Sequence, residues 1–273
     1  MRVDFYETLM TPAQEMDYVL PSLLVGSFGA FVAPGGMGKS MFALELAIHI
    51  AGGPDLLGVG PLKQGPVVYI SAEDPVIAIE DRIRNIGKHL SQEQIKTIRQ
   101  NLVIESISGR TPDLLDEKCV ELLVKQSEGR RLLILDTLRH FSTEDENSSS
   151  AMSKVLNRID LIARETNAAV IFTHHTSKDL DAQYTGRGSS VIAYHSRWQS
   201  VLREMTKSEA NAFGIDETKR TSYLRYSINK ANFGPCYKGS WLIRRENGLL
   251  EKVTLQKQQK SQKPSNGRVR GQA

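Results

Sequence analysis

A glycine-rich turn between an apolar run and a helical pattern carries the residues best suited to chemistry. The run from Phe28 to Val32 is apolar, the turn starts at Pro34, and Gly38-Lys39-Ser40 opens an amphipathic pattern that continues to Ile50. Strand, loop and helix in this order are the context of a phosphate-binding P-loop. The glycines let backbone N–H groups converge on phosphate oxygens, and the helix N-terminus adds its partial positive charge. The turn therefore predicts a site for a nucleoside triphosphate.

The residue types within this turn indicate how ATP and Mg²⁺ would be held. Lys39 is expected to reach the β- and γ-phosphates, and the hydroxyl of Ser40 is expected to ligate Mg²⁺. Ala33 stands where the first glycine of the pattern is usually found. A turn that only caps a core helix is the alternative, and the flanking strand and helix disfavour it. The expected nucleotide-binding residues are Pro34, Gly35, Gly36, Met37, Gly38, Lys39, Ser40 and Met41.

Two acidic residues end later apolar runs. Asp136 follows the run 132–135, which is how a strand presents a metal-binding carboxylate at the carboxyl edge of a parallel sheet. Glu73 ends the run that begins at Pro66, so it is expected at the same edge, where a carboxylate can orient the water that attacks the γ-phosphate. Asp74 is adjacent and remains an alternative for this role. Either position could instead cap the segment that follows.

His174 and His175 end a third apolar run, which begins at Ala168. No histidine or cysteine cluster at ligand spacing accompanies them, so a metal site is disfavoured. We expect one imidazole to sense the γ-phosphate and to pass the signal to the polar segment that follows. For the imidazole that points away, the alternative is a hydrogen bond to a neighbouring group.

Strand and helix patterns alternate through the first two thirds of the chain, which predicts an α/β fold with a mainly parallel sheet flanked by helices. From about residue 196 the pattern changes to short strands joined by turns. We expect one domain over residues 1–255, with its β-rich part at 196–255. Residues 256–273 carry five basic residues and no acidic one. They are predicted to form a disordered basic tail, either solvated or in contact with nucleic acid.

Composition disfavours several classes of protein. The 273 residues are 40% hydrophobic and 24% charged, which is typical of a packed globular core. Cys119 and Cys236 form no CxxC pair and are expected to be reduced thiols of a cytoplasmic protein. No apolar stretch approaches the ~20 residues of a membrane span, and the N-terminus does not resemble a secretory signal. The net charge of +4 is mild support for a polyanionic partner.

Six short motifs follow one another along the chain. They are Pro34-Gly-Gly-Met-Gly-Lys-Ser, Ala72-Glu-Asp, Leu133-Ile-Leu-Asp-Thr-Leu-Arg, His174-His-Thr-Ser-Lys, Arg187-Gly-Ser-Ser and Arg197-Trp-Gln-Ser. This ordered set resembles the RepA-type hexameric replicative helicases of broad-host-range plasmids, which belong to the RecA-like ATPases. The resemblance extends from about Asp17 to about Gly248. It implies a RecA-like fold and a six-membered ring that hydrolyses ATP at subunit interfaces and unwinds DNA at plasmid origins, where replication-initiation proteins would be further partners.

The resemblance also implies roles for single residues. Arg197 matches the arginine that a neighbouring subunit inserts toward the γ-phosphate; a surface arginine paired with a carboxylate is the alternative. Arg82 has a counterpart near the nucleotide, and Lys230 is similar to a second cation that acts in trans in related ring helicases. The residues expected to take part in catalysis are Lys39, Glu73, Arg82, His174, His175 and, in trans, Arg197, with Ser40 and Asp136 holding Mg²⁺.

Two loops would face the central channel of a RecA-like ring, roughly residues 139–150 and 176–190. The second contains Lys178, Arg187 and Ser189 together with flexible glycines. We expect it to contact the backbone of single-stranded DNA without reading the bases. The first loop is acidic, which argues against direct phosphate contact there.

Two other functions are compatible with such a core. A RecA-like ATPase could serve as a regulatory switch or assembly factor that does not unwind DNA, and a strand-displacement assay would distinguish it. A P-loop kinase could instead pass the γ-phosphoryl group to a small molecule. No arginine-rich lid segment is evident, and release of phosphate to water would exclude the kinase.

Overall fold

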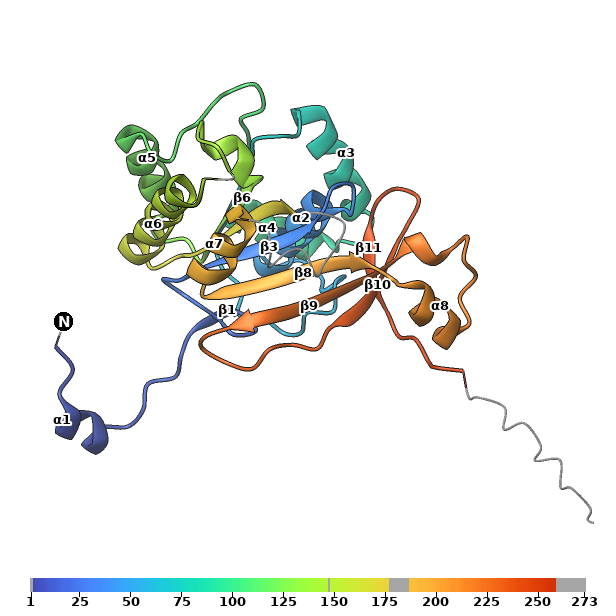
Figure 1. The fold of residues 1–273 in the computed structure, drawn as a ribbon, viewed down its shortest axis with the longest axis horizontal. Helices are drawn as coiled ribbons and strands as arrows, with labels where there is room; N and C mark the ends of the chain where they lie inside the picture. Colours follow the sequence, from blue (N-terminus) through green and yellow to red (C-terminus); the bar gives the residue numbers. More distant parts are fainter. Residues whose placement is uncertain (1, 147, 177–186, 259–273) are drawn as a thin grey trace, which may run out of the picture.

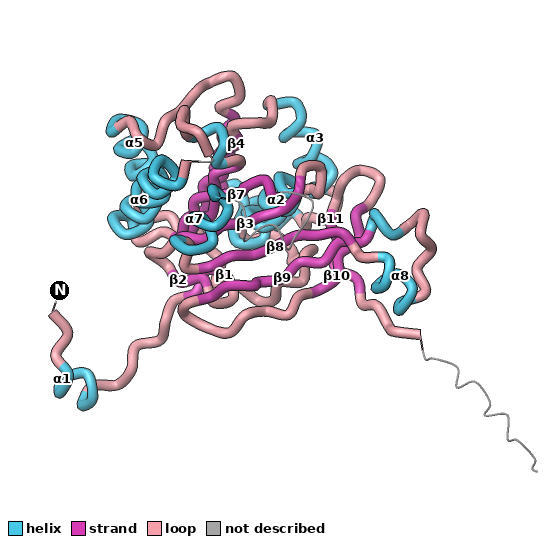
Figure 2. Tube along the Cα trace, in the orientation of Figure 1, coloured by secondary structure: helices cyan, strands magenta, loops and turns pink. Residues whose placement is uncertain are grey.

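Nine strands form one continuous sheet in the computed structural model, which describes residues 2–146, 148–176 and 187–258. Their order across the sheet is β11-β10-β9-β8-β3-β7-β6-β4-β5 (Figure 1, Figure 2). The strands are β3 (Phe28–Pro34), β4 (Val67–Ser71), β5 (Leu102–Ser106), β6 (Leu132–Asp136), β7 (Ala169–Thr176), β8 (Trp198–Glu204), β9 (Tyr223–Ala231), β10 (Ser240–Arg244) and β11 (Leu250–Val253). Two short strands, β1 (Tyr18–Leu20) and β2 (Leu23–Leu24), pair antiparallel with each other.

Six of these strands, from β8 to β5 across the sheet, pair in parallel, and β9, β10 and β11 extend the sheet in antiparallel fashion. The predicted α/β fold with a mainly parallel sheet is confirmed. The β-rich part is continuous with this sheet, because β8 pairs in parallel with β3 and antiparallel with β9. It therefore lies next to the P-loop strand.

Helices cover both faces of the sheet (Figure 1). Because alternate residues of a strand point to opposite faces, the buried side chains divide into two clusters. Phe31 and Ile134 belong to the cluster on the α2 side, whereas Val32 and Leu135 belong to the cluster that packs against α5, α6 and α7. The helices are α1 (Phe5–Met10), α2 (Lys39–Ile50), α3 (Val76–Gly87), α4 (Gln92–Asn101), α5 (Glu117–Ser127), α6 (Ser149–Thr166), α7 (Arg187–His195) and α8 (Lys207–Phe213), with 3-10 turns η1 (Leu138–Phe141) and η3 (Arg220–Ser222).

Helix α2, which follows the P-loop, is buried on all sides rather than amphipathic. Every residue from Met41 to Ile50 is buried, because the segment 52–65 and the C-terminal strands cover the face that the sheet leaves open. Two of its buried polar side chains, His49 and Glu45, form hydrogen bonds within the fold. Glu45 Oε1 accepts a hydrogen bond of 2.8 Å from the N–H of Leu250 in β11. The P-loop helix is thus tied directly to the last strand of the sheet.

Several elements differ from the sequence-based expectation. Helix α1 was not foreseen; none of its residues is buried, and it stands away from the body of the molecule (Figure 1). Helix α7 occupies the end of the segment 176–190 that was expected to be a loop. Residues 177–186 and 259–273, where the DNA-contacting loop and most of the basic tail were placed, lie outside the described residues. Among the described residues, no helix is long and apolar enough to cross a membrane.

Candidate active site

The glycine-rich turn connects β3 to α2 through two left-handed backbone positions. Gly36 and Gly38 have φ angles of 75° and 89°, a region that side chains with a Cβ rarely adopt. Gly38 is the N-cap of α2 and gives the helix no side-chain cap. The first N–H groups of α2 therefore have no side-chain acceptor, which is the arrangement that binds an anion at a helix N-terminus. The backbone of the turn thus requires glycine at positions 36 and 38. Position 33 does not require it, because Ala33 is a buried residue of β3.

Lys39 folds back over the turn and lies beside the histidine strand. Its Nζ donates to the carbonyl oxygens of Ala33 and Pro34, each at 3.2 Å, and lies 2.8 Å from His175 Nδ1. The residue is only 4% exposed. Burial lowers the pKa of Lys39 to about 8, although the negative charges of Asp136 and Glu73 act in the opposite direction. A phosphate group at this position would restore the favourable environment that the ammonium lacks.

Asp136 lies at the end of β6 and is fully buried. The hydroxyl of Tyr69 donates to Asp136 Oδ2 at 2.6 Å, and the hydroxyl of Thr173 donates to Oδ1 at 2.5 Å. Burial, followed by the charge of Asp136, raises the pKa of Tyr69 well above its ordinary value, so the phenol remains a donor. The two hydroxyls fix the orientation of the carboxylate.

The oxygen ligands at this edge suit Mg²⁺ bound together with phosphates. Mg²⁺ prefers hard oxygen ligands and is commonly held by one or two carboxylates, substrate phosphates and water. The orientated carboxylate of Asp136 and the hydroxyl of Ser40, at the start of α2, supply that kind of set. In the described part of the chain no group of three or more His, Cys, Asp or Glu side chains could hold a metal ion without such phosphates.

Glu73 and Asp74 follow β4 but have different surroundings. Asp74 is engaged by Arg82 of α3, whose Nη1 and Nη2 donate to its two carboxylate oxygens at 2.5 and 3.0 Å. Glu73 has a 48% exposed side chain, and its Oε2 lies 3.7 Å from His175 Nε2. Glu73 is thus free to contact a water molecule in the cleft, whereas Asp74 is committed to Arg82.

The two consecutive histidines point to opposite environments. His175 lies beside Ala33 in the β3–β7 register and contacts both Lys39 and Glu73. His174 is buried, and burial lowers its pKa to about 4, with the charges of His175 and Lys39 adding to the effect. Its imidazole is therefore neutral at physiological pH. Of the two candidates for a phosphate sensor, the geometry favours His175.

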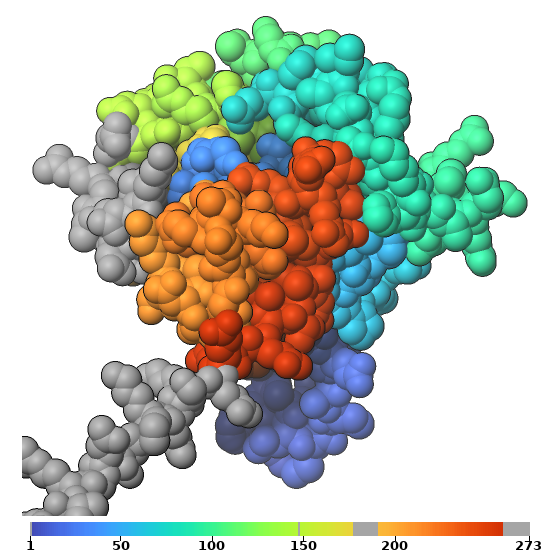
Figure 3. Space-filling view, turned by 90° about the vertical axis from the view of Figure 1, so that its right-hand side faces the viewer, coloured from blue at the N-terminus to red at the C-terminus, as the bar shows by residue number. Residues whose placement is uncertain are grey.

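A cleft of about 480 Å³ is lined by Lys39, Ser40, Glu73 and His175, whereas the buried Asp136 is not among its lining residues. Three of its lining residues, Arg244, Asn247 and Gly248, come from the β10–β11 hairpin, which the sequence did not indicate. Figure 3 shows this hairpin, in red, against the segment that contains α3, in teal. The P-loop, the start of α2 and the strand ends contribute Gly36, Gly38, Lys39, Ser40, Met41, Glu73, Asp74 and His175, and α3 contributes Ala78, Asp81 and Arg82. Pro34, Gly35 and Met37 line a separate cavity of about 310 Å³ on the other side of the turn.

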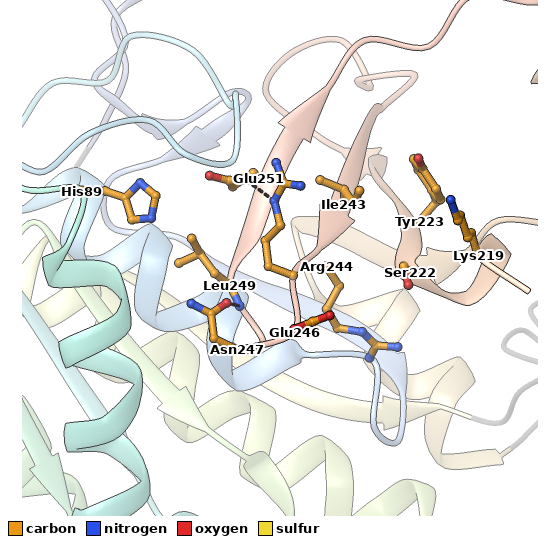
Figure 4. Close-up of a pocket in the computed structure, with 11 residues that line it drawn as sticks. His89, Lys219, Ser222, Tyr223, Ile243, Arg244, Glu246, Asn247, Leu249 and Glu251 are labelled. Carbon is orange, nitrogen blue, oxygen red and sulfur yellow. Dashed lines mark hydrogen bonds and ion pairs between the residues drawn. The ribbon is translucent and has the colours of Figure 1, made fainter. Parts of the chain in front are cut away.

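Arg244 links the hairpin to the P-loop. Its Nη1 donates to the carbonyl oxygen of Gly36 at 2.8 Å, and its Nη2 donates to that of Thr221 at 3.2 Å. Arg244 and Asn247 also line a neighbouring cavity of about 740 Å³, which extends along the hairpin toward His89 (Figure 4). The phosphate cleft therefore adjoins a larger hollow under the C-terminal hairpin.

Arg197 lies outside this cleft. It directly precedes β8, its side chain is exposed, and none of the described residues forms a hydrogen bond or ion pair with that side chain. The expected alternative, a surface arginine paired with a carboxylate, is not what the described residues show. Of the expected DNA-contacting residues, Lys178 lies outside the described residues, and Arg187 and Ser189 lie in α7 with side chains that are not described.

Comparison with known proteins agrees with this architecture. A family model described as an AAA domain (AAA_25) matches residues 1–181, well over half of the chain. The RadB recombinase has a similar fold in its crystal structure: 16% sequence identity, a TM-score of 0.54, and coverage of 84% of this chain and 91% of that one. A second solved structure, described as an ATPase domain, is similar at 16% identity and a TM-score of 0.57, covering 91% of this chain and 96% of that one. The chain belongs to the AAA_25 family of AAA domains and has the RecA-like P-loop ATPase fold.

Proposed function

We propose that this protein is a ring-forming, ATP-dependent DNA helicase of the RepA plasmid type, which hydrolyses ATP at subunit interfaces and moves on single-stranded DNA. The observation that carries the proposal is the separation of its charged groups. Lys39 and Glu73 line one cleft, and the charge of the buried Asp136 acts on Lys39. Arg197, the cation that would complete the site, is exposed outside this cleft. A second copy of the chain, in a homohexamer, would supply it.

In the proposed reaction the cleft binds the triphosphate along the start of α2. Lys39 and the free N–H groups of the P-loop hold the β- and γ-phosphates, and Glu73 orients the water that attacks the γ-phosphate. Mg²⁺, held by Ser40 and Asp136, would neutralise charge on the phosphate oxygens. His175 contacts Lys39 and Glu73 together, so it can report whether the γ-phosphate is present. Arg82 acts indirectly, by keeping Asp74 away from the attacking water.

Mixed oligomers test whether Arg197 acts in trans. Arg197→Ala chains keep a complete cleft, and Lys39→Ala chains keep Arg197, so neither oligomer alone should turn over ATP efficiently. Mixing them creates interfaces in which a Lys39→Ala chain presents Arg197 to an intact cleft. We expect mixing to restore part of the activity, and an absence of rescue together with a monomeric mass would contradict the proposal.

The proposed DNA contact lies in the segment that follows β7 in sequence, with Lys178 before α7 and Arg187 and Ser189 among the first residues of α7. Cations in a glycine-bearing segment suit contact with a phosphate backbone. Arg187→Ala should weaken binding of single-stranded DNA and flatten its salt dependence, because fewer counterions are released. Deleting the residues after Gln256 is the control. Loss of DNA stimulation in the deletion variant but not in Arg187→Ala would move the contact to the tail.

Unwinding of a forked duplex distinguishes the helicase from its alternatives. A helicase should separate the strands only with hydrolysable ATP, whereas a regulatory ATPase should turn over ATP without separating them. Replication-initiation proteins are the partners expected to load such a ring. Transfer of the γ-phosphoryl group to a small acceptor, instead of phosphate release to water, would support a kinase and contradict the proposal.

A further inference from the structure

Lys230 holds the end of helix α7. It lies near the end of β9, opposite Gln199 of β8 in the strand register. Its Nζ donates to the carbonyl oxygens of Ala193 at 2.6 Å and of Tyr194 at 3.0 Å. Both carbonyls belong to the last turn of α7, where a helix has no internal donors left. An ammonium group there also complements the negative end of the helix dipole.

The same end of β9 holds the backbone of Arg197. The N–H of Asn232, two residues after Lys230, donates to the carbonyl oxygen of Arg197 at 2.9 Å. Only Ser196 separates Arg197 from the end of α7, and the N–H of Ser196 donates to the carbonyl oxygen of Ile192 at 3.0 Å. The position of Arg197 therefore depends on the last turn of α7 and on β9 together.

Helix α7 is also fixed on its other side. Ile192 is buried in the cluster that includes residues of α6, and His195 Nε2 lies 3.5 Å from the hydroxyl of Ser153 in α6. Burial and the nearby charge of Arg197 lower the pKa of Lys230. The two cations thus lie close enough to influence each other, although Lys230 is directed to carbonyls of its own chain.

We propose that Lys230 is a positioning residue for Arg197: its ammonium fixes the last turn of α7 and so determines how Arg197 is presented to the neighbouring subunit. This inference rests on the proposed trans role of Arg197. It places the action of Lys230 within its own chain, on helix α7, whereas the resemblance to ring helicases implied that Lys230 acts in trans.

The test introduces Lys230→Met into either the Lys39→Ala chain or the Arg197→Ala chain of the mixed oligomer and measures the rescued ATP turnover. The methionine keeps much of the side-chain length and removes the charge. In the Lys39→Ala chain, which presents Arg197, it should lower the rescued turnover by about tenfold or more, because small misplacements of a catalytic group are costly. In the Arg197→Ala chain, which presents no arginine, it should change the rescued turnover by less than about twofold. Lys238→Met, at an exposed lysine beyond the same strand, is the matched control and should be silent in both chains.

Hydrogen exchange in the nucleotide-free protein separates positioning from direct contact. Lys230→Met should increase amide exchange in residues 191–196, and Lys238→Met should not. Unchanged exchange combined with the trans loss would show that Lys230 acts on the neighbour's phosphate, which overturns the positioning role. Equal losses in both placements, or no loss in either, would also overturn it. Absence of rescue in the parent mixture would instead overturn the trans role of Arg197, and this inference with it.

Discussion

Asp136 and Arg197 both carry a charge that the proposed chemistry requires, but they lie in opposite environments. Asp136 is fully buried, and hydroxyl groups of Tyr69 and Thr173 bond both of its oxygens. Arg197 is exposed, and only its backbone is held by a hydrogen bond from a described residue. The charge of Asp136 has its partners within the chain, whereas the side chain of Arg197 has no partner among the described residues.

This difference follows from the free energy of burying a charge. A buried carboxylate must have its partners within the fold, because an unpaired buried charge is strongly unfavourable. An exposed guanidinium has no such cost, so it can remain unpaired until a partner surface arrives. We infer that the chain completes the phosphate-binding half of the site by itself and leaves the second half to a neighbour. The predictions below test this division.

Removing the exposed side chain of Arg197, the second half of the proposed site, should have the largest effect on turnover. Arg197→Ala should lower kcat by about 10³ or more, the range known for arginine fingers, and leave ATP affinity nearly unchanged. Steady-state turnover and nucleotide titration measure the two quantities separately. Arg164→Ala, at an exposed arginine of α6, is the control. A matching loss of ATP affinity in Arg197→Ala would contradict the division.

The next largest effect is expected from Glu73. Glu73→Gln keeps the shape but removes the charge that orients water, so turnover should fall by about 10² while ATP binding persists. Glu80→Gln, at an exposed glutamate of α3, should be silent in the same assay. Near-normal turnover in Glu73→Gln would transfer the role to Asp74, against the pairing of Asp74 with Arg82.

A smaller effect should come from the depressed pKa of Lys39. Burial lowers the pKa of Lys39 to about 8 from its ordinary 10.5. Between pH 8 and 10.5 the unfolded chain therefore binds more protons than the folded one. The free energy of unfolding of the nucleotide-free protein should rise with pH over this range. Phosphates favour the charged lysine, so ATP binding above pH 8 should take up a proton and weaken, by at most about tenfold per pH unit. Calorimetry in buffers of different ionisation heat measures the uptake. Its absence at pH 9 would contradict the burial of Lys39.

The smallest effect concerns the hydroxyls that orient Asp136. Tyr69→Phe removes one buried hydrogen bond and should lower the free energy of unfolding by about 1–2 kcal/mol. It should also raise the Mg²⁺ concentration needed for half-maximal turnover. Denaturant unfolding and a Mg²⁺ titration are the measurements. A lower stability with an unchanged Mg²⁺ requirement would limit Tyr69 to a structural role.

The parts of the fold and site that the sequence predicted depend on local order along the chain. Strand, glycine turn and helix are adjacent in sequence, so the P-loop could be placed, and the three-residue spacing of Ser91 and Gln94 is that of a capping box at a helix start. The structure has that capping box at the start of α4. Asp136 and Glu73 could be placed because parallel strands end at one edge, and Ser71 and Asp136 are indeed opposite each other in the β4–β6 register.

The parts of the fold and site that the sequence did not predict depend on contacts between segments that are distant in the sequence. Tyr69 and Thr173 resemble ordinary strand residues until the order β4-β6-β7 places both beside Asp136. Arg244 lines the phosphate cleft only because β10 and β11 return to cover α2, about two hundred residues after the P-loop. Helix α7 was missed because Gly188, Ser189 and Ser190 near its start favour turns, whereas its packing on α6 comes from its last half.

Turnover of ATP with and without single-stranded DNA, on samples whose assembled mass is measured in the same buffer, tests the central claim most directly. The account predicts a particle of six chains whose turnover rises severalfold when single-stranded DNA is added. The mass and the stimulation should be lost together on dilution. A monomer that hydrolyses ATP at the same rate with and without DNA would contradict it.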